Sequence, residues 1–169
     1  MTDLIIDGVD LRILAQLQID ASLTNVSLAQ RVNASPATCL RRVKRLRELG
    51  VIERDVALLS QEKLAPATGL GLTALTEVTL DRQGEEAWAA FELRMGNETA
   101  VRQCYRVSPG PDFVMVLVAR DMADYLALSQ RLFTSDANVR NVKTYFSVKR
   151  SKFLPGLPLP AAPLSSHRP

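Results

Sequence analysis

The segment Ser35–Gly50 (SPATCLRRVKRLRELG) constrains this chain most, because its pattern is typical of one capped helix with two unlike faces. Ser35 can cap the first turn, Pro36 suits the first helical position, and Gly50 is the residue type that commonly follows a helix end. At about 100° per residue, the apolar side chains gather on one side and are expected to pack against a core. These inward positions are Leu40, Val43 and Leu46, with Cys39 at the edge.

The opposite face of the predicted helix presents arginine together with one hydroxyl and one small side chain. Two shorter helical patterns precede it, over residues 9–19 and 27–32, and Ser27 is the predicted cap of the second. Three short helices with a tight turn at Asn33-Ala34 predict a helix-turn-helix, a motif whose last helix enters a DNA major groove.

Residue type and position predict how this motif contacts DNA. Residues near the start of the last helix usually reach base edges, and later ones meet the phosphate backbone. Arginine can bind guanine in a bidentate manner, a threonine methyl can contact thymine, and helix N-terminal amides can bind phosphate. We therefore expect base contacts from Ser35, Ala37, Thr38 and Arg41, and phosphate contacts from Ser27, Arg42 and Arg45.

Positive charge is concentrated in the same region. The net charge of the 169 residues is +3, but residues 31–54 alone carry seven basic and two acidic side chains. That window therefore holds a charge of +5, and the rest of the chain is negative. Such asymmetry indicates an anionic partner for one part of the protein, and double-stranded DNA fits it.

Several classes of protein are excluded by what the sequence lacks. No apolar run approaches the roughly 20 residues that span a bilayer, and the acidic start MTDLIIDGVD is unlike a secretion signal. A cytoplasmic protein without a membrane partner is therefore expected. The only histidine, His167, lies near the end, and Cys39 and Cys104 show no ligand spacing. We expect no catalytic residues, no metal site and no cofactor, and hence no enzyme.

From residue 72 onward, strand and helix patterns alternate. Strand patterns cover 72–80, 99–108, 112–120 and 139–148, and helical patterns cover 85–95 and 121–133. The order β-α-β-β-α-β predicts a ferredoxin-like αβ-sandwich, in which two helices cover one face of an antiparallel sheet. A second copy of the module is the simplest cover for the other face. Val101 and Tyr105 are expected on one face of their strand and Cys104 on the other, and Met122 and Leu126 are expected to face the sheet.

The intervening segments complete the predicted domain organisation. Residues 51–59 have the composition of a strand or wing, residues 60–71 that of a linker, and the proline-rich end lacks any period. The sequence therefore predicts an α+β protein with four parts. They are a winged helix-turn-helix DNA-binding domain (1–54), a linker or strand (55–68), an αβ-sandwich domain (69–154) and an irregular tail (155–169).

Four stretches, in this order, resemble the Lrp/AsnC family of transcription regulators, also called feast/famine regulators. They are DGVDLRILAQLQIDASLTNVSLAQRV, SPATCLRRVKRLRELGVI, SPGPDFVMVLVARDMADY and NVRNVKTYFSVKRSKF, and the resemblance covers about residues 4–154. It implies that the sandwich domain pairs into homodimers, which often assemble into octamers. It also implies that an amino acid or a related metabolite binds at contacts between dimers and so alters transcription.

The resemblance places the effector loop at residues 108–112, between the second and third sandwich strands. Backbone amides in this turn suit the carboxylate of an amino acid, and Asp112 suits its ammonium group. A neighbouring subunit is expected to complete the pocket with residues 134–136. The expected effector-binding residues are Ser108, Gly110, Asp112, Thr134, Ser135 and Asp136. Pro109 stands where the family usually has glycine, and proline fixes φ and removes a donor.

Three hypotheses for the function follow. The leading one is a homo-oligomeric, sequence-specific DNA-binding transcriptional regulator that an amino acid or related metabolite modulates. An alternative, which Pro109 favours, is an effector-independent or architectural DNA-binding regulator. A third is a small-molecule-binding sandwich protein without a DNA role, in which the basic helix is incidental.

Overall fold

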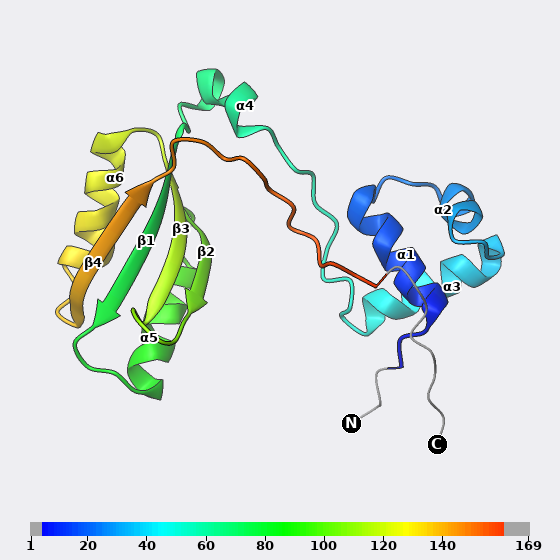
Figure 1. Cartoon of the computed structure of the whole chain (residues 1–169), viewed down its shortest axis with the longest axis horizontal. Helices are drawn as coiled ribbons and strands as arrows, with labels where there is room; N and C mark the ends of the chain where they lie inside the picture. Colours follow the sequence, from blue (N-terminus) through cyan, green and yellow to red (C-terminus); the bar gives the residue numbers. More distant parts are fainter. Residues whose placement is uncertain (1–4, 161–169) are drawn as a thin grey trace. The chain divides into compact units, whose positions relative to one another are not determined.

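The computed structural model describes residues 5–160, and the chain divides into two compact units. One unit takes the chain up to Ala57 together with the residues from Phe153, and the other takes Leu58–Lys152. Figure 1 shows helices alone in the first unit and a sheet with helices in the second. Each unit is built around its own buried apolar cluster. The predicted α+β class is confirmed.

Three capped helices form the first unit: α1 (Gly8–Ile19), α2 (Asn25–Arg31) and α3 (Pro36–Glu48). Ser35 caps α3 as predicted, because its hydroxyl accepts a hydrogen bond from the amide of Thr38 at 3.2 Å. The predicted cap of α2 is wrong. Thr24 caps this helix, and its hydroxyl accepts from the amide of Ser27 at 3.2 Å. Thr24 has the extended backbone of a cap residue, so the helix begins earlier and Ser27 lies inside its first turn.

The core of this unit lies where the three helices meet, and Ile13 and Val32 are fully buried there. One predicted position of α3 is wrong, because Leu40 is 60% exposed and Cys39 is fully buried. Cys39, Val43 and Leu46 follow the four-then-three spacing of a single helical face. That face turns Leu40 about 100° away from Cys39, toward solvent.

The described structure has no strand over residues 51–59, where the sequence predicts a strand or wing. Residues 53–59 are exposed, and the described sheet offers them no strand with which to pair their backbone. The predicted linker contains a short helix instead, α4 (Gln61–Thr68). Ser60 caps it, and Gly69 ends it in the left-handed region at a φ of 72°.

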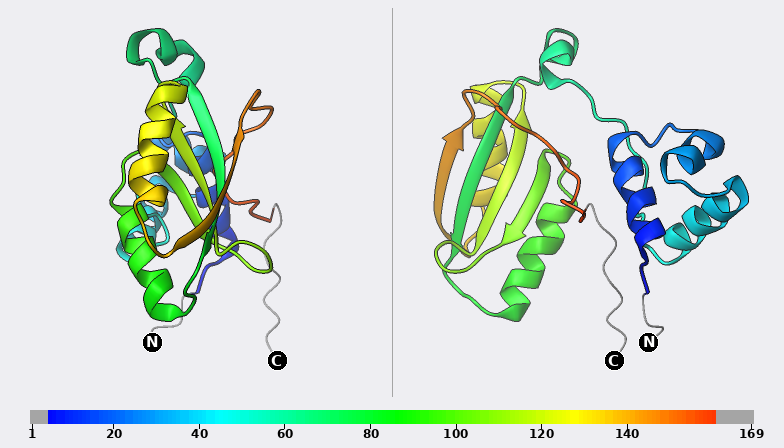
Figure 2. Two further views of the ribbon diagram at one scale, coloured as in Figure 1. Left: turned by 90° about the vertical axis from the view of Figure 1, so that its left-hand side faces the viewer. Right: turned by 45° about the vertical axis from the view of Figure 1, so that its right-hand side comes forward.

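The second unit has the predicted order β-α-β-β-α-β. Its elements are β1 (Leu72–Leu80), α5 (Glu85–Gly96), β2 (Val101–Arg106), β3 (Phe113–Ala119), α6 (Met122–Ser129), a π-helical turn (Gln130–Thr134) and β4 (Val139–Phe146). The strands form an antiparallel sheet in the order β2-β3-β1-β4. Figure 2 shows α5 and α6 against the same face of this sheet, which confirms the ferredoxin-like arrangement.

Strand β3 shows how the two faces of the sheet differ. Phe113, Met115 and Leu117 are fully buried on the helical side, whereas Val114 and Val116 are only half-buried on the other. Phe113 stacks on a phenylalanine of α5, with ring centroids 4.5 Å apart. The helices therefore complete one core, and the face that they leave open is apolar as well.

A β-bulge in β2 reverses the faces expected for part of that strand. The register against β3 shifts between Val101 and Gln103, so β2 holds one extra residue there. Cys104 consequently lies on the helical side with Val101, and Tyr105 lies exposed on the open face. The alternation from Val101 to Tyr105 that the sequence predicts is therefore wrong.

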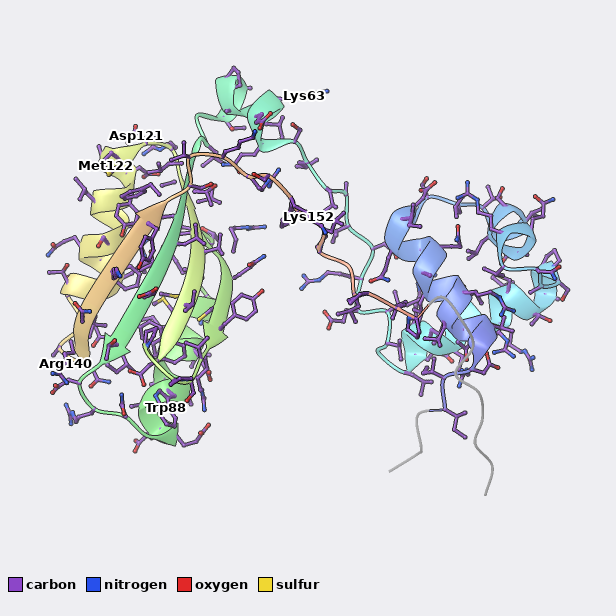
Figure 3. The ribbon with its side chains drawn as sticks, in the orientation of Figure 1. Lys63, Trp88, Asp121, Met122, Arg140 and Lys152 are labelled. Atoms are coloured by element: carbon purple, nitrogen blue, oxygen red, sulfur yellow. The ribbon has the colours of Figure 1, made fainter. Side chains whose placement is uncertain are left out.

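Helix α6 is capped by Asp121, as expected, but buries less of its surface than the pattern predicts. Figure 3 shows Asp121 and Met122 together at the start of this helix, and Met122 and Leu126 are both exposed. Tyr125 is the buried residue of this helix, and its hydroxyl hydrogen-bonds to that of Thr144 on β4 at 2.5 Å. A polar anchor therefore helps to set the rotation of α6 on the sheet.

The predicted tail is irregular where the structure describes it. Residues 147–160 form no helix or strand, and the rest of the predicted tail, with His167, lies outside the described residues.

Among the described helices, none combines the length and the apolar character that crossing a membrane requires.

Candidate nucleic-acid interface and ligand pocket

The turn between α2 and α3 holds the start of α3 in place. Asn33 adopts a φ of 53°, and the amide of Ala34 donates to the carbonyl of Ala29 at 3.0 Å. Across the turn, the side-chain amide of Asn25 donates to the carbonyl of Pro36 at 2.8 Å. The first turn of α3 is therefore fixed to α2 by hydrogen bonds as well as by the shared core.

The residues predicted to contact bases lie together on the accessible side of this first turn. Ser35, Ala37 and Arg41 are exposed, and Thr38 is half-buried. The hydroxyl of Ser35 donates to that of Thr38 at 2.9 Å, so the two side chains orient each other. Among the described residues, no carboxylate pairs with the guanidinium of Arg41. This face therefore presents one unneutralised arginine beside two hydroxyl groups.

Arg42 and Arg45, which were predicted to bind phosphate, are paired with carboxylates of α1 and its cap. Arg42 lies 2.6 Å from Asp7 and 3.0 Å from Asp10. Arg45 lies 2.6 Å from Asp10 and also donates to the carbonyl of Ile5 at 3.3 Å. Both guanidinium groups therefore join α1 to α3.

The carboxylates in this cluster are held by the helix cap as well. Asp7 caps α1, and its side chain accepts from the amides of Val9 and Asp10 at 2.9 and 3.0 Å. Burial alone would raise the pKa of Asp7, but the Asp10 amide and the Arg42 guanidinium outweigh it and lower the pKa. The hydrogen bonds from Arg42 to Asp7 and Asp10 raise the pKa of this arginine in turn. A cavity of about 270 Å³ lies beside the cluster, and Arg41 also lines it.

The predicted effector loop lines a separate cavity in the second unit, with a volume of about 350 Å³. The Ser108-Pro109 peptide is cis, and Gly110 has a φ of 119°. Three of the predicted residues line the cavity, Ser108, Gly110 and Asp112. Sequence reasoning missed four others, Gln83, Trp88, Arg106 and Val107, which come from outside the loop.

Asp112 is buried and has three hydrogen-bond donors from its own fold. One carboxylate oxygen, Oδ2, accepts from the backbone amide of Leu80 at 2.8 Å and from the side chain of Gln83 at 3.3 Å. The other, Oδ1, accepts from the indole of Trp88 at 3.0 Å. All three donors are neutral, and the described structure has no ion pair at Asp112. Its negative charge therefore stays unbalanced at the wall of the cavity.

Arg106 lines the same cavity but already has acidic partners. Its guanidinium lies 2.9 Å from Glu85 and 2.8 Å from Glu92, and it stacks 5.0 Å from the centre of the Trp88 ring. Figure 3 shows Trp88 on α5 toward the same end of the sheet as Arg140. No local motif signals these contacts, because the partners lie 14 and 21 residues from Arg106.

The remaining predicted effector residues do not line this cavity. Asp136 pairs with Arg94 of α5, and the hydroxyl of Ser135 donates to the carbonyl of Gln130 at 2.9 Å. Thr134 is exposed at the end of the π-helical turn. A single chain therefore brings together half of the predicted site.

Comparison with known proteins matches both units. The model for winged helix-turn-helix DNA-binding domains matches residues 6–53, and the model for the Lrp/AsnC ligand binding domain matches residues 73–157. The leucine-responsive regulatory protein of Rhizobium meliloti is 37% identical over 147 residues, with 87% of this chain and 92% of that protein covered. The transcriptional activator DecR of Escherichia coli is 30% identical, with 91% and 99% covered.

A solved structure agrees with these matches. The transcriptional regulator NMB0573 of Neisseria meningitidis, in complex with L-Met, is 30% identical and has a TM-score of 0.81, with 91% of this chain and 97% of that chain covered. Fold and matches together define a DNA-binding transcriptional regulator with a separate ligand-binding domain, and not an enzyme. The chain belongs to the Lrp/AsnC family, whose members include regulators that respond to amino acids.

The substitution Asp112→Ala is expected to destabilise the second unit, because it leaves the buried amide of Leu80 and the half-buried indole of Trp88 without an acceptor. A loss of about 1–3 kcal/mol in the free energy of unfolding is expected. Urea unfolding followed by the emission of Trp88, the only tryptophan, measures it. The control is Asp81→Ala, which removes an exposed carboxylate. Equal stability of the two variants would contradict the structural role of Asp112.

Proposed function

We propose that this chain is a cytoplasmic, homo-oligomeric regulator that reads double-stranded DNA with the outward face of α3. The observation that carries the proposal is the guanidinium of Arg41, which pairs with no carboxylate of residues 5–160 and lies beside Ala37 and Thr38 on a helix whose other face is buried. In this proposal, Ser35 and these three residues contact base edges in the major groove, and the first turn of α2 at Ser27 lies near a phosphate. Arg42 and Arg45 can bind phosphate only if they break their ion pairs with Asp7 and Asp10.

The substitution Arg41→Ala is expected to weaken specific binding by about 1–3 kcal/mol, because it removes a bidentate base contact. Fluorescence anisotropy on the upstream region of the protein's own gene, against a scrambled duplex, measures the loss. The matched control is Arg140→Ala, which removes the same charge from an exposed position of β4. If both variants bind the specific duplex as the wild type does, α3 does not read bases through Arg41.

A homodimer would cover the open face of the sheet. Besides the half-buried valines of β3, this face exposes Leu75 (41%) and Tyr145 (45%), which are paired across β1 and β4. Two sheets packed face to face would bury these side chains, as in other sheet sandwiches. Such a pair would present two copies of α3 to a near-palindromic site, and further pairing of dimers into octamers is part of the same proposal.

The substitution Leu75→Lys is expected to reduce the oligomeric state, because a charge would be buried at the centre of the paired sheets. Light scattering coupled to size-exclusion chromatography measures the mass. Leu93→Lys is the control, since Leu93 is 71% exposed on α5, which lies on the other face of the sheet. A variant at position 75 with the mass of the wild type would exclude this face as the dimer interface.

We propose further that the cavity beside residues 108–112 binds the α-amino and carboxylate groups of an amino acid. A carboxylate has about four acceptor positions, and Asp112 uses three, so Oδ1 retains one for an ammonium group. The unbalanced charge of Asp112 favours the same group. The loop amides at Ser108 and Gly110 would take the ligand carboxylate, and residues 134–136 of a neighbouring subunit would close the site.

Trp88 offers a direct test, because it lines the cavity and is the only tryptophan. Titration with each amino acid is expected to give a saturable change in its emission for the cognate ligand, and the same ligand is expected to shift DNA affinity. If no amino acid alters either signal while DNA binding is normal, the chain is an effector-independent regulator.

A further inference from the structure

Three arginines of α3 lie around the first cavity, but acidic side chains neutralise two of them. Arg41, Arg42 and Arg45 all line it, together with Asp7 and Asp10. The two carboxylates make three ion pairs of 2.6 to 3.0 Å with Arg42 and Arg45. The cluster as a whole therefore carries a single net positive charge, which belongs to Arg41.

Asp10 is the centre of this cluster. It is fully buried, and its carboxylate accepts from both guanidinium groups and from the backbone amide of Asp7 at 3.2 Å. Arg42 is itself half-buried, and its Nε has no hydrogen-bond partner among the described residues. Because one of its donors is already unsatisfied, the position of the Arg42 side chain depends strongly on its two bonds to Asp7 and Asp10.

We infer that Asp10 is a positioning and specificity-determining residue for DNA recognition, because it withholds Arg42 and Arg45 from the phosphate backbone. The inference rests on the proposed DNA contact by α3. Phosphate contacts are made to any sequence, whereas base contacts distinguish sequences. By neutralising two arginines next to the base-reading residues, Asp10 limits non-specific affinity and leaves Arg41 as the cation that faces DNA. Asp7 supports this by sharing Arg42.

The substitution Asp10→Asn tests the inference, because it removes the charge and keeps the size of the side chain. The dependence of log K on log salt for a scrambled duplex is expected to become steeper by about one, because Asp10 is the only described carboxylate that pairs with Arg45 and the released guanidinium can gain a phosphate. The ratio of specific to non-specific affinity is expected to fall at the same time. A residue with only a structural role would lower both affinities and would not steepen the salt dependence.

Two further variants keep the test decisive. Asp7→Asn preserves a good capping residue and frees one bond of Arg42, so it is expected to steepen the salt dependence less, even if Asp10→Asn does not fold. Asp20→Asn makes the same change in net charge in the same unit, at a side chain that bonds Ser22 and forms no ion pair in the described structure. It is expected to match the wild type.

The outcomes separate this inference from the proposed function. If the wild-type chain binds no DNA at low salt, the proposed function fails and the inference fails with it. If the wild type binds DNA and folded Asp10→Asn has the wild-type salt dependence, the inference alone is overturned. Where Asp10→Asn does not fold, the same result for Asp7→Asn overturns it. Adding Arg45→Gln to Asp10→Asn is expected to reverse most of the steepening, because Arg45 is the guanidinium that loses its only described carboxylate partner.

Discussion

The structure of the first unit depends on how α3 divides its side chains between two faces. Cys39, Val43 and Leu46 pack into the core against α1 and α2, and this burial fixes the rotation of the helix. Fixed rotation is what allows Arg41 to stay outside, on the same side as the first-turn hydroxyls. A recognition helix therefore depends on the apolar packing of its other face, because a helix that could rotate would present no defined surface to DNA.

Local sequence signals predict much of this fold, because capping and period act over a few residues. Ser35 and Asp121 cap the helices that they were expected to cap, and the order of strands and helices follows from their periods. The predictions fail where contacts with residues distant in the sequence determine the local structure. The bulge that turns Tyr105 outward depends on pairing with β3, and the burial of Cys39 in place of Leu40 depends on where α1 and α2 lie against the helix.

Prediction of the two sites is limited in the same way, by contacts between residues that are distant in the sequence. The exposed face of α3 that carries Arg41 could be predicted, because a helical projection needs only one segment. The partners of Arg42 could not, because Asp7 and Asp10 lie 35 and 32 residues away. Likewise, the loop at 108–112 is visible in the sequence, but the donors that hold Asp112 come from β1, the loop after it and α5. Composition shows that these charges exist, and only the fold shows which of them are already neutralised.

Asp10 and Asp112 illustrate how much the partner matters for a buried carboxylate. Each accepts three hydrogen bonds, and each borders a cavity. The donors of Asp10 include two guanidinium groups, so its charge is cancelled and it acts by holding cations in place. The donors of Asp112 are all neutral, so its charge remains and can attract a cation such as an ammonium group. The same side chain can thus restrain DNA contacts in one unit and attract a ligand in the other.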